Sequence, residues 1–135
     1  MVTTMTEEEN KQISKTFPKA ERLNSKKLIK ELFQEGSSFH FYPIRTTYLL
    51  QKDAPAAKPQ VMFSVPKRNF KKAVDRNKIR RRLRESYRSN KYLLSEGTNT
   101  DFFFVIAFIY TGKEILSFKQ IDNKLKTSLL RLKNI

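Results

Sequence analysis

The amino-acid sequence predicts a single domain of the α/β class, an α+β sandwich whose elements follow the order α-β-β-α-β-α. The chain has 135 residues, which is enough for one hydrophobic core and short for two. Segments with helical periodicity alternate with segments rich in aromatic and β-branched residues, which is the pattern of helices packed on a sheet. The apolar run from Phe102 to Tyr110 favours a strand in the middle of that sheet, covered on both faces.

The first helix is predicted just before Gly36. Apolar residues recur at helical spacing between positions 28 and 33, Asn24 or Ser25 is a suitable N-terminal cap, and Gly36 can end the helix. Residues 1–16 precede it without apolar periodicity. We therefore expect a flexible N-terminal tail, followed by a single domain over residues 17–135.

Two strands are predicted next. Residues 44–50 follow Pro43 and are rich in aromatic and β-branched side chains, and there is room for a shorter strand before that proline. Residues 51–60 contain two prolines and should form a surface loop. Residues 61–65 then alternate in the manner of a strand with one face toward a core, and Pro66 ends it.

The second half of the chain adds two helices around the apolar strand. A basic connector, KRNFKK, leads to a helix over residues 74–92, and turn signals follow at Gly97 and Asn99. After the apolar strand, Ser117 is a suitable cap for a last helix, whose apolar residues recur at roughly helical spacing up to Leu132.

The charge of the chain indicates a polyanionic partner. There are 28 Lys and Arg residues against 13 Asp and Glu, a net charge of +15, which favours nucleic acid first and an anionic membrane surface second. The chain has no cysteine, which excludes disulfides and thiol catalysis and fits a cytoplasmic protein. Its longest apolar run is far short of the roughly 20 residues that span a membrane, so we expect no membrane partner.

The basic helix holds most of that charge. From Lys67 to Arg88 there are 11 basic residues and two acids, a net of +9 against +6 for the rest of the chain. Ile79, Leu83 and Tyr87 form one apolar stripe of this helix, and a neighbouring sector is polar and basic. A charged helical face is often only solvated, but crowding of like charges opposes helix formation. We therefore favour an external anion, for which arginine forks are well suited to phosphate and base edges.

The same segment carries a resemblance to a known family. The string VPKRNFKKAVDRNKIRRRLRESYR is similar to the signature of the bacterial ribonuclease P protein subunit, a basic helix of the form R-N-R-x-K-R-x-x-R-E after a strand end of the form V-S-K-K. The matching positions are Arg76, Asn77, Lys78, Arg80, Arg81, Arg84 and Glu85. The likeness continues in FPKAERL, in ELFQEG, in the apolar strand and in the last helix, and it spans roughly residues 17 to 132. Asn69 and Phe70 depart from it, because many relatives have a glycine in this connector.

The resemblance implies two RNA-binding regions. In this family the protein assists a catalytic RNA that removes 5′ leaders from precursor tRNA. The residues that it assigns to binding of the catalytic RNA are Lys67, Arg68, Arg76, Asn77, Lys78, Arg80, Arg81, Arg84 and Arg88. It also implies a cleft between the first helix and the sheet that binds the single-stranded leader, with Phe17, Arg22, Phe33 and Tyr48 as candidates and Lys19 as a further phosphate contact. Phe33 lies on the apolar stripe of its helix, so a plain core position is an equal alternative.

The resemblance also implies where the chemistry resides. The phosphodiester hydrolysis would use Mg²⁺ held mainly by the RNA subunit, and the protein would carry no catalytic residue and no metal site. The single histidine, His40, lies between Phe39 and Phe41 and is expected to be a strand or packing residue. The expected fold is ribosomal protein S5 domain 2-like, with a left-handed βαβ crossover that runs against the usual hand.

Three other functions remain open on the sequence. A ribosomal or other structural RNA-binding protein would share the size, the charge and the lack of catalytic groups. A DNA-binding regulator is disfavoured, because such proteins usually place a short recognition helix in a small helical domain, so we expect no DNA partner. A free-standing nuclease would need catalytic carboxylates or histidines that the sequence does not group together.

Overall fold

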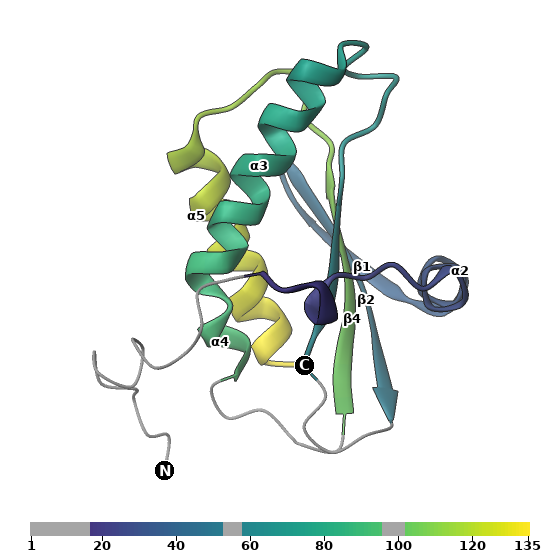
Figure 1. The fold of residues 1–135 in the computed structure, drawn as a ribbon. Coiled ribbons are helices and arrows are strands. Elements are labelled where there is room, and N and C mark those ends of the chain that lie inside the picture. The colour runs from purple at the N-terminus through teal and green to yellow at the C-terminus, as the bar shows by residue number, and fades with distance from the viewer. Residues whose placement is uncertain (1–16, 53–57, 96–101) are drawn as a thin grey trace.

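The computed structural model describes residues 17–52, 58–95 and 102–135. A sheet of four strands carries α3 and α5 on one face and α2 on the other (Figure 1). The elements are η1 (Lys19–Glu21), α2 (Lys26–Glu35), β1 (Ser37–Phe41), β2 (Ile44–Lys52), β3 (Gln60–Ser64), α3 (Ala73–Asn90), α4 (Tyr92–Ser95), β4 (Phe102–Tyr110) and α5 (Phe118–Lys133). The predicted tail, and the predicted turn at Gly97 and Asn99, lie outside the described residues.

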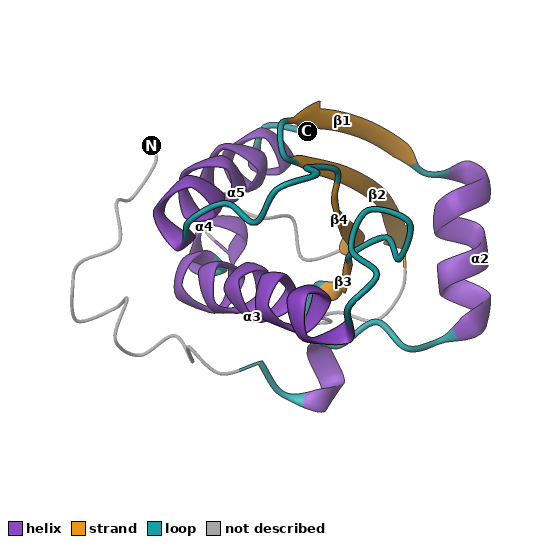
Figure 2. Cartoon of the chain, turned by 90° about the horizontal axis from the view of Figure 1, so that it is seen from above, coloured by secondary structure: helices purple, strands orange, loops and turns teal. Residues whose placement is uncertain are grey.

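The strand order confirms the α+β sandwich and the central place of the apolar strand. The order is β1-β2-β4-β3; β2 is antiparallel to both β1 and β4, and β3 is parallel to β4. The short strand for which there was room before Pro43 is β1. The parallel pair β3 and β4 is joined through α3 on the side of the sheet that α5 also covers, and the path of the ribbon in Figures 1 and 2 agrees with a left-handed crossover.

Hydrophobic packing on both faces of β4 explains its unbroken apolar sequence. Phe104, Ile106 and Phe108 face α3 and α5, where the stripe Ile79, Leu83 and Tyr87 and the apolar side of α5 complete the main core. The residues between them, Val105 and Ala107, face the other way and form a second, smaller core with Leu32 of α2. Each face of the sheet is thus buried by a helix, which stabilises the strand in its central position.

The ends of two helices follow the expected capping chemistry, and the start of α3 does not. The Ser25 side chain accepts a hydrogen bond from the Leu28 backbone N–H at 3.3 Å, and Ser117 and Gln120 form a capping box at the start of α5. Helix α3 begins instead after Lys72, whose side chain forms no capping hydrogen bond. The start of the basic helix is therefore held by other contacts.

Candidate RNA interface

Helix α3 and the connector before it present the basic residues to solvent. Asn77, Lys78, Arg81, Arg84 and Arg88 are exposed and Arg80 is half-buried, while the apolar stripe of the same helix is buried in the core. Lys67 and Arg68 are exposed on the connector that leads into the helix. The helix therefore packs with one side and displays guanidinium groups on another, as its sequence predicts.

Two arginines of α3 bind carbonyl oxygens of the protein itself. The Nη1 of Arg76 donates to the backbone oxygens of Phe70 and Lys71 at 2.8 and 2.9 Å. The Nη1 of Arg82 donates to the oxygen of Leu116 at 2.6 Å, which ties α3 to the segment before α5. These contacts distinguish the two residues from Arg81, Arg84 and Arg88, whose side chains are exposed.

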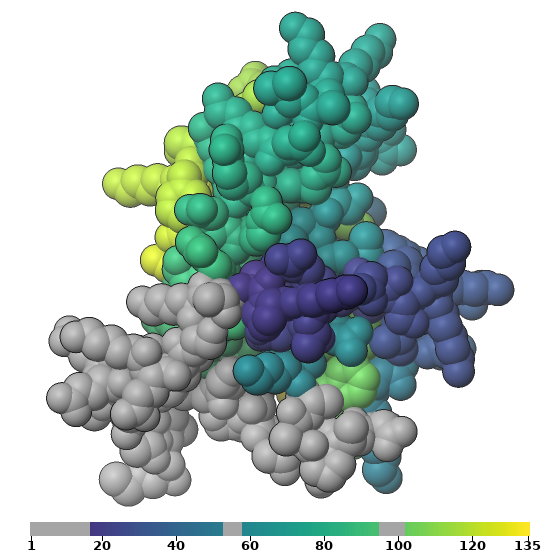
Figure 3. Space-filling view, viewed as in Figure 1, coloured from purple at the N-terminus to yellow at the C-terminus, as the bar shows by residue number. Residues whose placement is uncertain are grey.

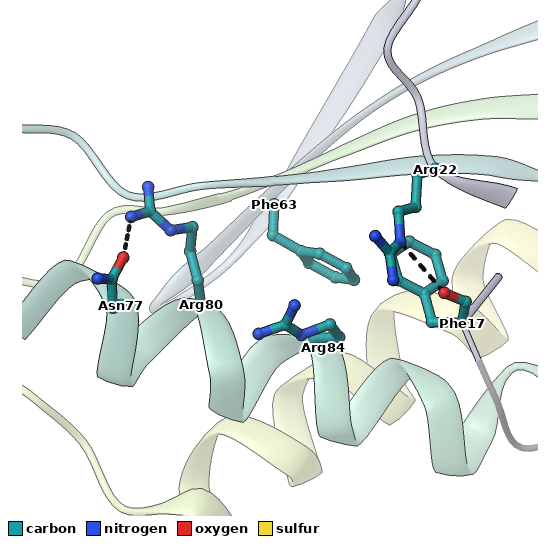
Figure 4. A pocket seen from close by; sticks show the side chains of 6 residues that line it. All are labelled: Phe17, Arg22, Phe63, Asn77, Arg80 and Arg84. Atoms are coloured by element: carbon teal, nitrogen blue, oxygen red, sulfur yellow. Dashed lines mark hydrogen bonds between the residues drawn. The ribbon is translucent and has the colours of Figure 1, made fainter. Parts of the chain in front are cut away.

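A pocket lies where the first described residues, β3 and α3 meet (Figure 4). Its volume is about 300 Å³. The residues that line it are Phe17, Arg22, Phe63, Asn77, Arg80 and Arg84. In the space-filling view the first described residues, in purple, lie directly against α3, in teal (Figure 3). The segment 17–25 thus forms one wall of a site whose opposite wall is the basic helix.

Aromatic rings form the apolar side of this pocket. The rings of Phe17 and Phe63 meet edge to face with centroids 5.6 Å apart, and both rings also contact Tyr87. Phe63 stacks on Phe108 with an interplanar angle of 15°. Burial raises the pKa of the Tyr87 hydroxyl, and the negative charge of Glu21 raises it further, so this hydroxyl stays neutral beneath the pocket.

Guanidinium groups form the polar side. The Arg22 guanidinium lies 5.5 Å from the centroid of the Phe17 ring, a cation–π distance, and its Nε donates to the Phe17 oxygen at 3.1 Å. The Arg80 Nη2 donates to the Asn77 side-chain oxygen, which fixes the direction of that guanidinium (Figure 4). Arg84 has no hydrogen bond or ion pair to any other described residue and points toward Phe63. None of the described residues that line the pocket carries a carboxylate, so the field of these residues favours an anion.

The structure does not bring all four candidates for leader binding into one cleft. Phe17 and Arg22 line the pocket, whereas Phe33 lies on α2, on the opposite face of the sheet. The Phe33 side chain is 50% exposed, so the alternative of a plain core position is wrong. Tyr48 is half-buried on β2, with its ring 5.9 Å from that of Phe39. Lys19 is exposed in η1.

Sequence reasoning did not single out Phe63 as a site residue. The strand pattern predicts a core position for Phe63, because Val61, Phe63 and Val65 share one face and alternate with Met62 and Ser64. That assignment describes its ring correctly, but β3 is an edge strand, so the same ring also reaches the pocket. The sequence feature that could have indicated a binding role for Phe63 is its position shortly before a connector with four cations.

The described residues include no cluster of metal-ligating side chains. No three of their His, Cys, Asp and Glu side chains gather as metal ligands. His40 is exposed on β1, and its Nε2 lies 2.7 Å from the Thr111 hydroxyl oxygen. Within the same described ranges, no helix is long and apolar enough to cross a membrane.

Comparisons with known proteins identify relatives along almost the whole chain. The family model described as Ribonuclease P matches residues 17–133. The ribonuclease P protein component of Porphyromonas gingivalis is 36% identical over 115 residues, 84% of each chain. That of Citrifermentans bemidjiense is 37% identical over 123 residues, which are 89% of this chain and 95% of the relative.

Solved structures agree with this relationship. The ribonuclease P protein of Thermotoga maritima superimposes with a TM-score of 0.64 at 27% identity, over 82% of this chain and 96% of that one. The ribonuclease P protein of Staphylococcus aureus has the same TM-score at 22% identity, which shows a shared fold. A family match over this length, together with relatives above one-third identity, shows that the chain belongs to the ribonuclease P protein family, the protein component of the ribonucleoprotein enzyme that matures the 5′ ends of tRNA.

Proposed function

We propose that α3 and its connector bind the catalytic RNA of ribonuclease P, and that the adjacent pocket holds an unpaired nucleotide of the precursor-tRNA leader. The observation that carries this proposal is a pocket with an aromatic side that Arg22, Arg80 and Arg84 line, at the edge of an exposed arginine surface. The family membership supplies the RNA subunit as partner. The assignment of particular residues to each RNA is our proposal.

The exposed surface of α3 suits a folded RNA. Lys78, Arg81 and Arg88, with Lys67 and Arg68 on the connector, offer guanidinium and ammonium groups to phosphates. Arg88 forms an ion pair with Glu85 at 3.7 Å, and both side chains are exposed, so this pair is weak. An RNA phosphate can therefore replace the Glu85 carboxylate as the partner of Arg88 at little cost in free energy.

The pocket suits one unpaired nucleotide. A base can stack on an aromatic ring whatever its identity, and arginine adds both charge and a planar surface. The volume of about 300 Å³ is of the size of one nucleotide rather than of a duplex. The exposed ring of Phe33 offers a second stacking surface on the other face of the sheet, whereas the packed ring of Tyr48 offers little free area.

The protein assists without supplying the metal. The described carboxylates do not group as ligands, so we assign no step to a metal held by the protein and propose that the RNA subunit holds the Mg²⁺. The residues of this chain would bind and orient the two RNAs. Since both RNAs act in tRNA maturation, we propose the cytoplasm as the place of action.

The test is cleavage of the 5′ leader at low, near-physiological magnesium, with the catalytic RNA alone, the protein alone, and both together. We expect efficient cleavage only in the mixture. Cleavage by the protein alone would contradict the assisting role, and a mixture no better than the RNA alone would contradict the function as a whole.

The pocket is tested separately with the variant Arg22→Ala/Arg84→Ala. We expect it to weaken binding of the holoenzyme to precursor tRNA and to leave binding of mature tRNA, which has no leader, unchanged. Lys124→Ala/Arg131→Ala on α5 removes the same charge from exposed positions outside the pocket and serves as the matched control. Equal losses for precursor and mature tRNA would contradict the assignment of the leader to the pocket.

A further inference from the structure

Arg76 differs from its neighbours in the basic motif because its guanidinium turns back onto the protein. The side chain is half-buried, and its Nη1 bridges the carbonyl oxygens of Phe70 and Lys71, at 2.8 and 2.9 Å. These two residues belong to the connector that carries Lys67 and Arg68. Arg76 therefore joins the first turn of α3 to the segment that precedes it.

The connector needs such a contact for two physical reasons. It holds four cations, Lys67, Arg68, Lys71 and Lys72, next to the N-terminus of α3, where the helix dipole is positive. The helix also begins after Lys72, whose side chain forms no capping hydrogen bond. Both conditions favour a loosened connector, unless other contacts hold it.

Three sets of contacts between described residues oppose this loosening. The Asn69 N–H donates to the Pro66 oxygen at 3.2 Å, which closes a turn. The Phe70 ring is buried and lies 5.9 Å from that of Tyr110. Arg76 adds two hydrogen bonds to the carbonyls on either side of the Phe70–Lys71 peptide, and a charged donor makes these bonds strong.

We propose that Arg76 is a positioning residue, which fixes the connector so that Lys67 and Arg68 meet the RNA, and that it is not itself an RNA contact. This inference rests on the proposed RNA-binding role of the connector and refines it. The arginine that opens the basic motif thus acts through its neighbours. A lysine in its place has donors but a shorter reach and no planar fork, so it should replace the contact only in part.

A double-mutant cycle on the affinity for the catalytic RNA separates positioning from direct contact. We expect Arg76→Ala to weaken binding roughly fivefold to tenfold in the wild-type background, and less than about twofold in a Lys67→Ala/Arg68→Ala background. Arg81→Ala is the matched control, because Arg81 is exposed and should weaken binding equally in both backgrounds. Equal effects of Arg76→Ala in the two backgrounds would overturn the proposal.

Hydrogen exchange of the RNA-free protein gives a second readout. Arg76→Ala should speed amide exchange between residues 67 and 72 while α5 keeps its protection, and Arg76→Lys should restore part of the protection. Unchanged exchange in the connector would also overturn the proposal. A separate result would contradict the proposed RNA-binding role of α3 and its connector. In that case the triple variant Lys67→Ala/Arg68→Ala/Arg81→Ala would bind the catalytic RNA as tightly as wild type does.

Discussion

At the residue scale, Thr46 on β2 carries a buried hydroxyl that has no hydrogen-bond partner among the described residues. A buried polar group without a partner costs folding free energy that an apolar isostere does not. We expect Thr46→Val to raise the free energy of unfolding by about 1 kcal/mol, measured by urea denaturation. Valine keeps the β-branched shape that the strand requires.

Thr127 provides the control for this substitution. Its hydroxyl donates to the Asn123 oxygen at 3.0 Å on the surface of α5. Thr127→Val should change the free energy of unfolding by no more than about 0.5 kcal/mol. A stabilisation of equal size at both positions would point to the general hydrophobicity of valine and not to the unpaired hydroxyl.

A second residue-scale feature is the buried ion pair between Glu21 and Lys91. The Lys91 ammonium lies 3.1 Å from each carboxylate oxygen of Glu21, and their side chains are only 7% and 4% exposed. Removal of one partner leaves a buried charge without compensation, so we expect Lys91→Met to lower the free energy of unfolding by about 3–5 kcal/mol. The double variant Glu21→Gln/Lys91→Met should recover part of that loss, and a purely additive result in urea denaturation would contradict this coupling.

This pair also bears on the site. Glu21 lies next to Arg22, and Lys91 is the C-cap residue that follows the last residue of α3. The ion pair therefore connects the first described segment to the C-terminal end of the basic helix. These two segments form the two walls of the pocket, and the paired residues are 70 positions apart in the sequence.

At the element scale, α3 and α5 are joined by a polar cluster around Asp122. Its Oδ1 accepts hydrogen bonds from Ser86 at 2.7 Å and from Asn90 at 2.9 Å, and Lys126 forms an ion pair with the Oδ2. Partial burial alone would raise the pKa of Asp122, but the hydrogen bonds from Ser86 and Lys126, the charge of Lys126 and the hydrogen bond from Asn90 outweigh it. The pKa is therefore below its usual range.

The sign of this shift fixes a pH dependence. A carboxyl whose pKa is lower in the folded than in the unfolded state stabilises the fold above the unfolded pKa, near 3.9, and this contribution is lost as the pH falls through the folded pKa. We expect Asp122→Asn to be less stable than wild type at pH 7 in urea denaturation, with the difference between the two shrinking below about pH 4. A difference that stays constant down to pH 2 would contradict this assignment.

The elements were largely predictable from the sequence, because their signals are local. Gly36, Ser117 and the apolar run of β4 each mark a boundary through the chemistry of a few neighbouring residues, and the structure confirms all three. The pocket was not predictable as a unit. Phe63 and Arg84 meet only because β3 lies at the edge of the sheet beside α3, and periodicity carries no information on strand order.

Local sequence patterns also give no information on the tertiary contacts of a side chain such as that of Arg76. The family resemblance groups Arg76 with Asn77 and Arg80 as an RNA-binding residue. The sequence cannot show that the Arg76 side chain folds back onto the carbonyls of Phe70 and Lys71. Phe33 is the opposite case. Its place on the apolar stripe of α2 left the core as an equal alternative, but α2 covers the sheet mainly through Leu32, so the ring of Phe33 remains exposed.

At the scale of the whole molecule, positive charge lies on more than one side. The net charge is +15, and the segment from Lys67 to Arg88 contributes +9 of it. Helix α5 adds exposed cations of its own, and η1 and α5 lie on opposite sides of α3 (Figure 2). A non-specific attraction to RNA would use all of these charges, whereas a docking surface would use those of α3.

The salt dependence of RNA binding distinguishes the two cases. Each phosphate contact contributes roughly 0.7 to 0.9 to the slope of log affinity against log salt concentration, because the protein cations displace counterions from the RNA. We expect Lys78→Ala/Arg81→Ala/Arg88→Ala to flatten the slope for the catalytic RNA by roughly two to three. Lys119→Ala/Lys124→Ala/Arg131→Ala removes the same charge from exposed positions of α5 and should leave the slope nearly unchanged. Equal flattening by both variants would mean that net charge and not the α3 surface governs binding, because a general field of the molecule does not distinguish one helix from the other.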